Sequence, residues 1–280
     1  MSTLNTLTAN RIPVLMLAAG ALAATAHGQT LLSHYTLDGS GVDTGSLDVD
    51  GSLNGAASYS TSGTGVGVFD QALSTGPGTN DYFFAETGGN FGLSAITITM
   101  WVNVDVGASG DRLISNISSA SNAGFDLYLQ NYVTGTDGDP DSFRLAFGVN
   151  STSGAVQSIS SNYVSDKWLF LAVTYDATLG SDNVLFYSGD EATSVGLNST
   201  LSKTGSIAAS PLNLEVGGTP VTPSDRTPTA LFNDVRVYSG ILDSTALEAV
   251  RASTIPEPST YALIFGGLLA CLVGLQRRRK

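Results

Sequence analysis

The feature that most constrains this chain is a strict alternation of residue types in the segment AITITMWVNV, residues 95–104. One face of an extended segment would carry Ile96, Ile98, Met100, Val102 and Val104. A period of two over this length is typical of a β-strand and does not match the 3.6-residue period of a helix. The chain must therefore contain a sheet that packs at least one face against a core.

Seven further segments show short apolar or alternating runs, separated by clusters rich in Gly, Asp, Ser and Thr. Gly, Asn and Asp supply the positive φ angles that tight turns require, and the chain has 32 Gly. This pattern predicts an all-β fold, a two-sheet antiparallel jelly-roll sandwich. A single helix is expected after Asp243 or Ser244. The further predicted strands are residues 31–37, 125–130, 143–149, 168–175, 183–188, 212–217 and 230–238.

The first 28 residues have the composition of a secretory signal peptide. Arg11 precedes an apolar run from Ile12 to Ala24, and small residues follow at a plausible cleavage site. The run has no amphipathic face of the kind that a helix buried in a soluble domain would need. We therefore expect residues 1–28 to form a signal-peptide helix that is removed, and residues 29–254 to form the secreted domain.

The last residues, 255–280, combine three parts in order: a Pro-Glu-Pro motif, an apolar run and a basic end. The run from Tyr261 to Leu275 carries no charge and is slightly shorter than the roughly 20 residues that span a bilayer. Basic residues after such a run favour a cytoplasmic end. The pattern predicts a short transmembrane helix that holds the protein at the inner membrane transiently.

This order resembles the PEP-CTERM sorting signal of Gram-negative bacteria. In that family a membrane protease, an exosortase, cuts near the Pro-Glu-Pro motif, and family members are associated with exopolysaccharide and biofilm matrix. The resemblance implies export through the inner membrane and a place at the cell surface or in the extracellular matrix once the tail is removed. It also implies that the sorting signal is read through Pro256, Glu257, Pro258, Arg277, Arg278 and Arg279.

The domain between the two ends resembles a laminin-G-like, concanavalin A-like lectin/glucanase jelly roll. The resemblance covers nearly the whole domain and rests on motifs that occur in the family's order. They are HYTLDGSGVDTG (34–45), GVFDQALST before NDYFFA (67–85), SAITITMWVNV (94–104), DKWLFLAVTYD (166–176) and FNDVRVYSGILDSTALEAV (232–250).

The acidic residues of the domain do not form the pattern that glycoside hydrolysis needs. Hydrolases of this fold class carry paired carboxylates about 5 to 9 Å apart, contributed by one strand. Glu86, Glu191, Glu215 and Glu248 are the Glu of the domain, and none stands two or four residues from another acid on a predicted strand. The domain also lacks Cys and a Gly-x-Ser-x-Gly motif, and its one His is His34. We therefore expect no enzymatic activity.

Acidic loops predict a structural Ca²⁺, since hard cations take carboxylate and carbonyl oxygens as ligands. The family resemblance implies a site between the first and last strands, with the carboxylate of Asp234 and carbonyls near Asp38. A second loop carries acids at alternate positions, Asp137, Asp139 and Asp141, although it departs from the EF-hand pattern. All of these acids are equally suited to shaping turns, because Asp often bonds its own backbone.

Aromatic residues next to turns are candidates for stacking on a sugar ring, and Tyr82, Tyr132 and Tyr163 have such positions. Trp101 and Trp168 lie inside long apolar strands and are expected in the core. The net charge of −12 would repel the phosphates of nucleic acids, which are therefore excluded as partners.

These observations predict a secreted or cell-surface, non-enzymatic, lectin-like protein of the extracellular matrix. Its expected partners are a polysaccharide or surface glycoprotein, the exosortase and, transiently, the inner membrane. Two alternatives stay open: a structural or adhesive protein that binds other proteins, and a divergent glycoside hydrolase.

Overall fold

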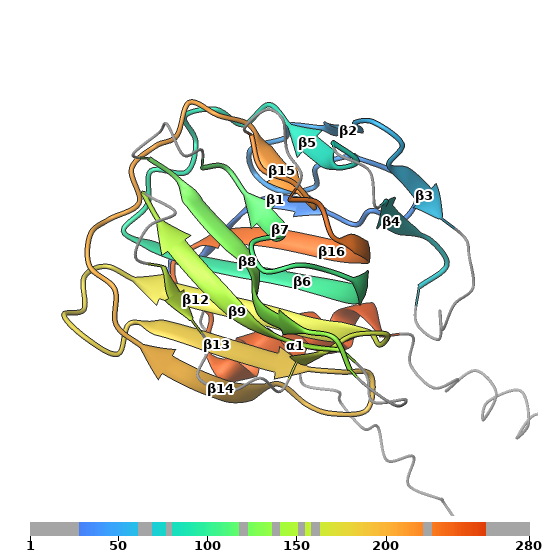
Figure 1. Ribbon diagram of the computed structural model, residues 1–280. Coiled ribbons are helices and arrows are strands. Elements are labelled where there is room, and N and C mark those ends of the chain that lie inside the picture. The colour runs from blue at the N-terminus through green and yellow to red at the C-terminus, as the bar shows by residue number, and fades with distance from the viewer. Residues whose placement is uncertain are drawn as a thin grey trace, which may run out of the picture.

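The computed structural model describes residues 28–60, 69–76, 80–117, 123–135, 141–150, 155–157, 163–220 and 226–255. These residues form two antiparallel sheets, packed face to face in a sandwich, and one helix (Figure 1). The predicted all-β jelly-roll sandwich is confirmed. All eight predicted strands are present, and each of their ends lies within three residues of the predicted position.

Sheet A contains the longest strands. Its strand order is β14-β13-β12-β6-β16-β4-β3, and β1 pairs with β16 beside this path. Its strands are β1 (Thr30–Tyr35), β3 (Ser58–Ser60), β4 (Ala72–Thr75), β6 (Ala95–Val106), β12 (Leu169–Asp176), β13 (Val184–Gly189), β14 (Gly196–Leu201) and β16 (Thr229–Ser239).

Sheet B lies in front of sheet A in Figure 1. Its strand order is β10-β9-β8-β7-β15-β5-β2, and β11 pairs with β9. Its strands are β2 (Gly51–Leu53), β5 (Phe83–Ala85), β7 (Arg112–Ser115), β8 (Phe125–Val133), β9 (Ser142–Val149), β10 (Val156–Gln157), β11 (Tyr163–Val164) and β15 (Leu214–Val216).

The main core lies between the sheets, where the apolar face of β6 meets residues from sheet B such as Leu127 and Phe147. The opposite face of β6 is buried as well. There Trp101 belongs to a second cluster with Phe69, Trp168 and Phe170, and its ring meets those of Phe69 and Phe170 edge to face. Trp101 and Trp168 are 0% and 3% exposed, so their predicted place in the interior is confirmed.

The helix α1 (Ser244–Thr254) covers this second cluster on the side of sheet A that faces away from sheet B. Asp243 is its N-cap, because its carboxylate accepts a hydrogen bond from the Ala246 amide at 2.8 Å. The side chain of Leu247 is fully buried against the sheet. The predicted helix and its cap are therefore both confirmed.

The predicted signal-peptide helix and the predicted C-terminal span fall on residues 1–27 and 256–280, outside the described residues. Within the part of the chain that the structure describes, no helix is long and apolar enough to cross a membrane.

The N-cap of α1 gives a first test of the fold. Replacing Asp243 by Ala leaves the first-turn amide of Ala246 without its acceptor, and we expect the free energy of unfolding to fall by about 1 kcal/mol. Asp243→Asn keeps an acceptor in place and should stay close to the wild type. Urea denaturation of the three proteins measures the difference, and an Ala variant as stable as the wild type would contradict the assigned cap.

Candidate functional site

Asp38 and Asp234, the first predicted calcium ligands, have very different surroundings. Asp38 is exposed in the turn that follows β1, whereas Asp234 is 3% exposed in the middle of β16. Asp234 has a φ of +49° at a register shift between β16 and β6, and its amide donates to the Thr36 carbonyl. Asp is one of the few residues that adopts this backbone conformation readily.

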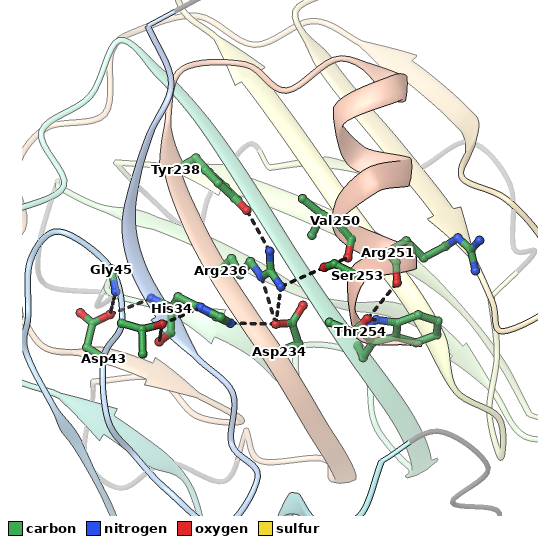
Figure 2. Close-up of polar contacts among 12 residues, drawn as sticks. His34, Asp43, Gly45, Asp234, Arg236, Tyr238, Val250, Arg251, Ser253 and Thr254 are labelled. Atoms are coloured by element: carbon green, nitrogen blue, oxygen red, sulfur yellow. Dashed lines mark hydrogen bonds and ion pairs between the residues drawn. The ribbon is translucent and has the colours of Figure 1, made fainter. Parts of the chain in front are cut away.

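Two cationic or hydrogen-bonding side chains already occupy the Asp234 carboxylate. Its Oδ1 atom lies 2.8 Å from Nε2 of His34 and accepts a hydrogen bond from Nε of Arg236 at 3.0 Å. Oδ1 also forms an ion pair with Nη2 of Arg236 at 2.9 Å (Figure 2). Since the guanidinium of Arg236 balances the carboxylate, this position does not favour a metal cation. A calcium site formed by Asp38 and Asp234 stays a prediction.

His34 also contacts a hydroxyl group, that of Thr44. The three hydrogen-bonded residues Thr44, His34 and Asp234 have the same order as the nucleophile, base and acid of a catalytic triad. The Oγ1 atom of Thr44 lies 2.7 Å from Nδ1 of His34. Nucleophilic catalysis also needs free N–H donors near the nucleophile, to stabilise the oxyanion. The amides of residues 43–47 all donate to other groups of the protein. These three hydrogen-bonded residues are therefore best explained as a structural contact that ties β1 to β16.

The second predicted calcium loop is only partly described, because Asp137 and Asp139 lie outside the described residues. Asp141 accepts hydrogen bonds from the hydroxyl of Tyr132 at 2.7 Å and from the amide of Gly135 at 2.8 Å, and these bonds lower its pKa.

Burial and the nearby charges of Asp105 and Asp141 raise the pKa of Asp166. These carboxylates lie near one another, but no group of three His, Cys, Asp or Glu within the described residues is arranged to hold a metal.

The three tyrosines predicted to bind a ligand are not equivalent. Tyr163 is fully buried and stacks on Phe143 with ring centroids 5.6 Å apart, so its ring is not available to a sugar. The expectation that Tyr163 is exposed is corrected: pairing of β11 with β9 turns its ring into the core. Tyr132 is half-buried and bonded to Asp141, and Tyr82 is half-buried beside β5.

The outward face of sheet B brings together two carboxylates that lie far apart in sequence. Ser115 of β7 pairs with Glu215 of β15 on one side and with Asp126 of β8 on the other. Directly paired residues of antiparallel strands point to the same face, and two strand spacings separate their backbones by about 10 Å. Glu215 and Asp126 therefore flank Ser115 in one row across the sheet.

Asp126 forms a buried ion pair on this face. Its Oδ2 atom lies 3.1 Å from Nη2 of Arg112, and both side chains are at most 2% exposed. The Arg112 guanidinium also lies over the ring of Tyr128, 4.3 Å from its centroid, in a cation–π contact. Burial raises the pKa of Asp126 to about 6, although the charges of Arg112 and Arg226 oppose this effect.

Glu215 lies under a turn that two glycines make possible. Gly217 has a φ of +74°, and a Cβ on Gly218 would lie 2.8 Å from Tyr82 and 3.0 Å from Oε2 of Glu215. The backbone thus folds back over the carboxyl, which is 4% exposed and has no hydrogen-bond partner at Oε2 within the described residues. Burial raises the pKa of Glu215 to about 8, so the group is mostly protonated at neutral pH.

Two half-exposed rings stand beside this carboxyl. Phe84 pairs with Glu215 across β5 and β15, and Tyr82 lies two residues before Phe84 on the same face. Their ring centroids are 6.4 Å apart in an edge-to-face arrangement. We refer to Tyr82, Phe84 and Glu215 as the Glu215 site.

Sequence reasoning identifies Tyr82 but treats Glu215 as an unpaired acid and does not single out Asp126 or Arg112. The signals available in the sequence were weak: a charged residue inside each of three apolar strands, and a Gly-Gly pair after the Glu215 strand. Charged residues are rarely buried unless they are paired, so a charge within an apolar strand indicates a partner on another strand.

The fold has a clear family assignment. A family model described as the concanavalin A-like lectin/glucanases superfamily matches residues 77–247, which is more than half of the chain. The chain belongs to this superfamily. No curated protein matches the sequence of this superfamily member.

Several solved structures share the fold of this concanavalin A-like domain at low sequence identity. Domain 4 of AbnA, a GH43 extracellular arabinanase from Geobacillus stearothermophilus solved with arabinotriose, has a TM-score of 0.56 and 15% identity, with 79% of this chain and 98% of that chain covered. A botulinum neurotoxin serotype D ligand-binding domain in complex with N-acetylneuraminic acid has a TM-score of 0.55 and 12% identity, over 80% of this chain and 51% of that chain. The binding domain of Paraclostridial Mosquitocidal Protein 1 has a TM-score of 0.55 and 13% identity, over 80% and 52%. The concanavalin A-like chain thus spans about half of each toxin domain.

The C-terminal segment matches a second family model, the PEP-CTERM protein-sorting motif, over residues 254–280. The predicted sorting signal is confirmed as a family match, although Pro256, Glu257, Pro258 and the Arg residues lie outside the described residues. The motif implies export and processing by an exosortase at the cell surface.

The buried carboxyl of Glu215 makes stability depend on pH. The unfolded chain releases this proton near the ordinary pKa of 4.5, whereas the folded chain holds it up to about 8. The free energy of unfolding contributed by Glu215 is therefore full below pH 4.5 and falls as the pH rises to 8. Glu215→Gln removes this titration. As the pH rises from 4.5 to about 8, the free energy of unfolding of the variant should therefore increase by a few kcal/mol relative to that of the wild type.

Urea denaturation at several pH values measures this gain, and Asp126 titrates equally in all of the proteins compared. Glu86→Gln is the matched control, because Glu86 is exposed on the segment just after β5. A Glu215→Gln variant whose stability follows the wild-type pH profile would contradict a buried, protonated Glu215.

Proposed function

We propose that this protein is a non-enzymatic carbohydrate-binding protein of the cell surface or extracellular matrix, and that it binds its ligand on the outward face of sheet B. The observation that carries the proposal is the pair of half-exposed rings, Tyr82 and Phe84, in the Glu215 site. Aromatic rings with one open side offer the flat apolar surface on which the C–H groups of a sugar ring pack.

The rest of this face supplies polar groups at partly exposed positions. Gln130 of β8 pairs with Arg144 of β9, and Gln157 of β10 pairs with Ala146 of β9. The middle of the face, at Ser115, Asp126 and Ala146, is fully buried, so the open positions lie toward its two ends. Amide groups that both donate and accept hydrogen bonds are well matched to sugar hydroxyls.

Two of the similar structures support this class of ligand, because their titles name an arabinotriose complex and an N-acetylneuraminic acid complex. At 15% and 12% identity they share the fold only, so the support is for a sugar as such and not for either of these sugars. The sorting motif supports a place outside the cell, where polysaccharides and surface glycoproteins are available.

Burial of the two carboxylates supports binding without catalysis. A catalytic carboxyl must reach the atom whose proton it transfers, yet Asp126 is 0% and Glu215 is 4% exposed. Asp126 is also held by Arg112, which disfavours a change of partner.

One observation favours the alternative of a divergent glycoside hydrolase. Asp126 and Glu215 lie in one row on one face, and burial raises the pKa values of both. A raised pKa is what a general acid requires. The other alternative, an adhesive protein that binds other proteins, would use the open ends of the same face.

Removal of the Tyr82 ring tests the binding face. On an array of bacterial and algal polysaccharides, we expect the wild-type protein to bind and Tyr82→Ala to lose about tenfold or more in affinity, because the apolar stacking surface is gone. Tyr82→Phe keeps the ring and should bind within about twofold of the wild type. Equal binding by the Ala variant would place the ligand elsewhere.

The same samples separate the three functions. Release of reducing ends from any bound polysaccharide, lost in Glu215→Gln, would replace the binding proposal with a hydrolase. A complete lack of binding, with the folded state verified by its melting transition, would favour the adhesive protein.

Calcium remains a proposal for the acidic loop that ends at Asp141. Its support is that the charges of Asp105 and Asp141 both act on Asp166, although no three such groups within the described residues already surround a metal position. A divalent cation bound to this group would add to stability in proportion to its saturation. At a calcium concentration about 100-fold above the dissociation constant, the melting temperature should rise by roughly 5 °C or more, and a chelator should reverse the rise.

Two variants locate the effect. Asp141→Asn should abolish the calcium-dependent rise, whereas Asp38→Asn should keep it. The reverse result would move the site to the Asp38 region, and a wild type insensitive to calcium would refute the proposal.

A further inference from the structure

The sorting motif begins where the folded domain ends, with no linker between them. The family match to the motif starts at residue 254, and Thr254 is the last residue of α1. Ile255 packs against the cluster on the outer face of sheet A, and Pro256 is the next residue in the chain. The segment that an exosortase must read is therefore joined directly to a packed surface.

The last turn of α1 is bound to the sheet by a buried tryptophan. Nε1 of Trp101 donates to the hydroxyl of Thr254 at 2.7 Å, and this hydroxyl donates to the Arg251 carbonyl at 2.8 Å. Trp101 is 0% exposed in the centre of β6, so its indole is a rigid partner. Thr254 is thus held both to its own helix and to the middle of the sheet.

Neighbouring residues strengthen the same attachment. Nη2 of Arg236 donates to the hydroxyl of Ser253 at 3.3 Å, and Figure 2 shows Arg236 between Asp234 and Ser253. Arg251 forms a salt bridge with Glu248 and donates to the Asp190 carbonyl at 2.7 Å. The final turn therefore contacts β16, the loop after β13 and the core of sheet A.

The geometry leaves little room for a protease. An extended chain advances at most about 3.6 Å per residue, so Glu257 can lie no more than about 7 Å from the Cα atom of Ile255. A protease cleft must surround its substrate on several sides. Such a cleft can enclose the Pro-Glu-Pro segment only when the residues before it leave the surface of the domain.

We propose that the last turn of α1, residues 253–255, is a latch that must open before the sorting tail is removed, and that the Trp101–Thr254 hydrogen bond holds it closed. The folded domain then slows the removal of its own sorting tail. The rate of tail removal depends on the fraction of molecules in which the end of α1 is detached from the sheet. This inference rests on the sorting motif and is independent of the proposed ligand.

The test follows tail removal from the full-length, epitope-tagged chain in the producing bacterium by pulse-chase. Trp101→Phe keeps an aromatic ring but removes the donor. Loss of one hydrogen bond should raise the open population, and with it the rate of tail removal, about fivefold. A flexible Gly-Ser linker inserted between Ile255 and Pro256 separates the Pro-Glu-Pro segment from the surface of the domain. This variant should lose its tail at least as fast as Trp101→Phe.

Trp168→Phe is the matched control. Trp168 is 3% exposed in the same aromatic cluster, and its Nε1 has no hydrogen-bond partner within the described residues, so the substitution removes a similar volume without touching the latch. Its rate of tail removal should equal that of the wild type. If Trp101→Phe fails to fold, Thr254→Val takes its place in the test, because it removes the acceptor of the same hydrogen bond.

Wild-type rates in both Trp101→Phe and the linker variant would overturn the latch. So would acceleration by the linker alone with a folded Trp101→Phe protein, because spacing would then matter and the hydrogen bond would not. Equal acceleration by Trp101→Phe and Trp168→Phe would also overturn it, since general loosening of the cluster would explain both. A wild-type chain that keeps its tail would refute both the latch and the processing on which it depends.

Discussion

Strand β16 pairs with β1, β4 and β6, and most of the described structure depends on these pairings. The strand lies in the middle of sheet A. Val235 and Val237 belong to the main core, and Asp234 and Arg236 form an ion pair on the outward face of the sheet. Its register against β6 shifts at Asn233 to Arg236, and the positive φ of Asp234 accommodates the shift. A β-bulge of this kind bends the strand and redirects the side chains that follow it. Because α1 begins only five residues after β16 ends, the same register places the helix over the aromatic cluster.

Each sheet carries an ion pair on its outward face. Asp126 and Arg112 are fully buried on sheet B, whereas on sheet A the buried Asp234 pairs with the partly buried Arg236. The free energy lost when two charges leave water offsets much of the free energy gained from their attraction. These pairs therefore contribute little to the free energy of folding. They do penalise a register slip heavily, because a shift of one residue would leave an unpaired charge in the interior. The pairs are thus well suited to selecting one alignment of strands among several that apolar contacts alone would tolerate.

The long strands could be read from the sequence, because β6, β12 and β16 carry their own alternation. The short strands β2, β5, β10 and β11 could not, since two or three residues hold no period and gain their identity from their partners. The same limit applies to the site. Asp126 and Glu215 become neighbours only through their common partner Ser115, and sequence spacing does not contain that register. Tyr82 is expected at the surface because it stands beside a turn, and it is partly exposed, but Tyr163 has a similar position and is buried by its pairing with Phe143.

The pairing of β1 with β16 has a consequence for a chain that is synthesised from its N-terminal end. His34 and Asp234 are separated by 200 residues, so β1 lacks the partner strand that it has in the described structure until β16 has been synthesised. Non-local pairings of this kind fold slowly and leave apolar edges open to other chains meanwhile. During that interval β6 lacks one of its two partners and presents an unpaired edge. Closure of sheet A must therefore wait for β16, the last strand of the described structure, so the two sheets reach their final pairing only when nearly the whole domain is present.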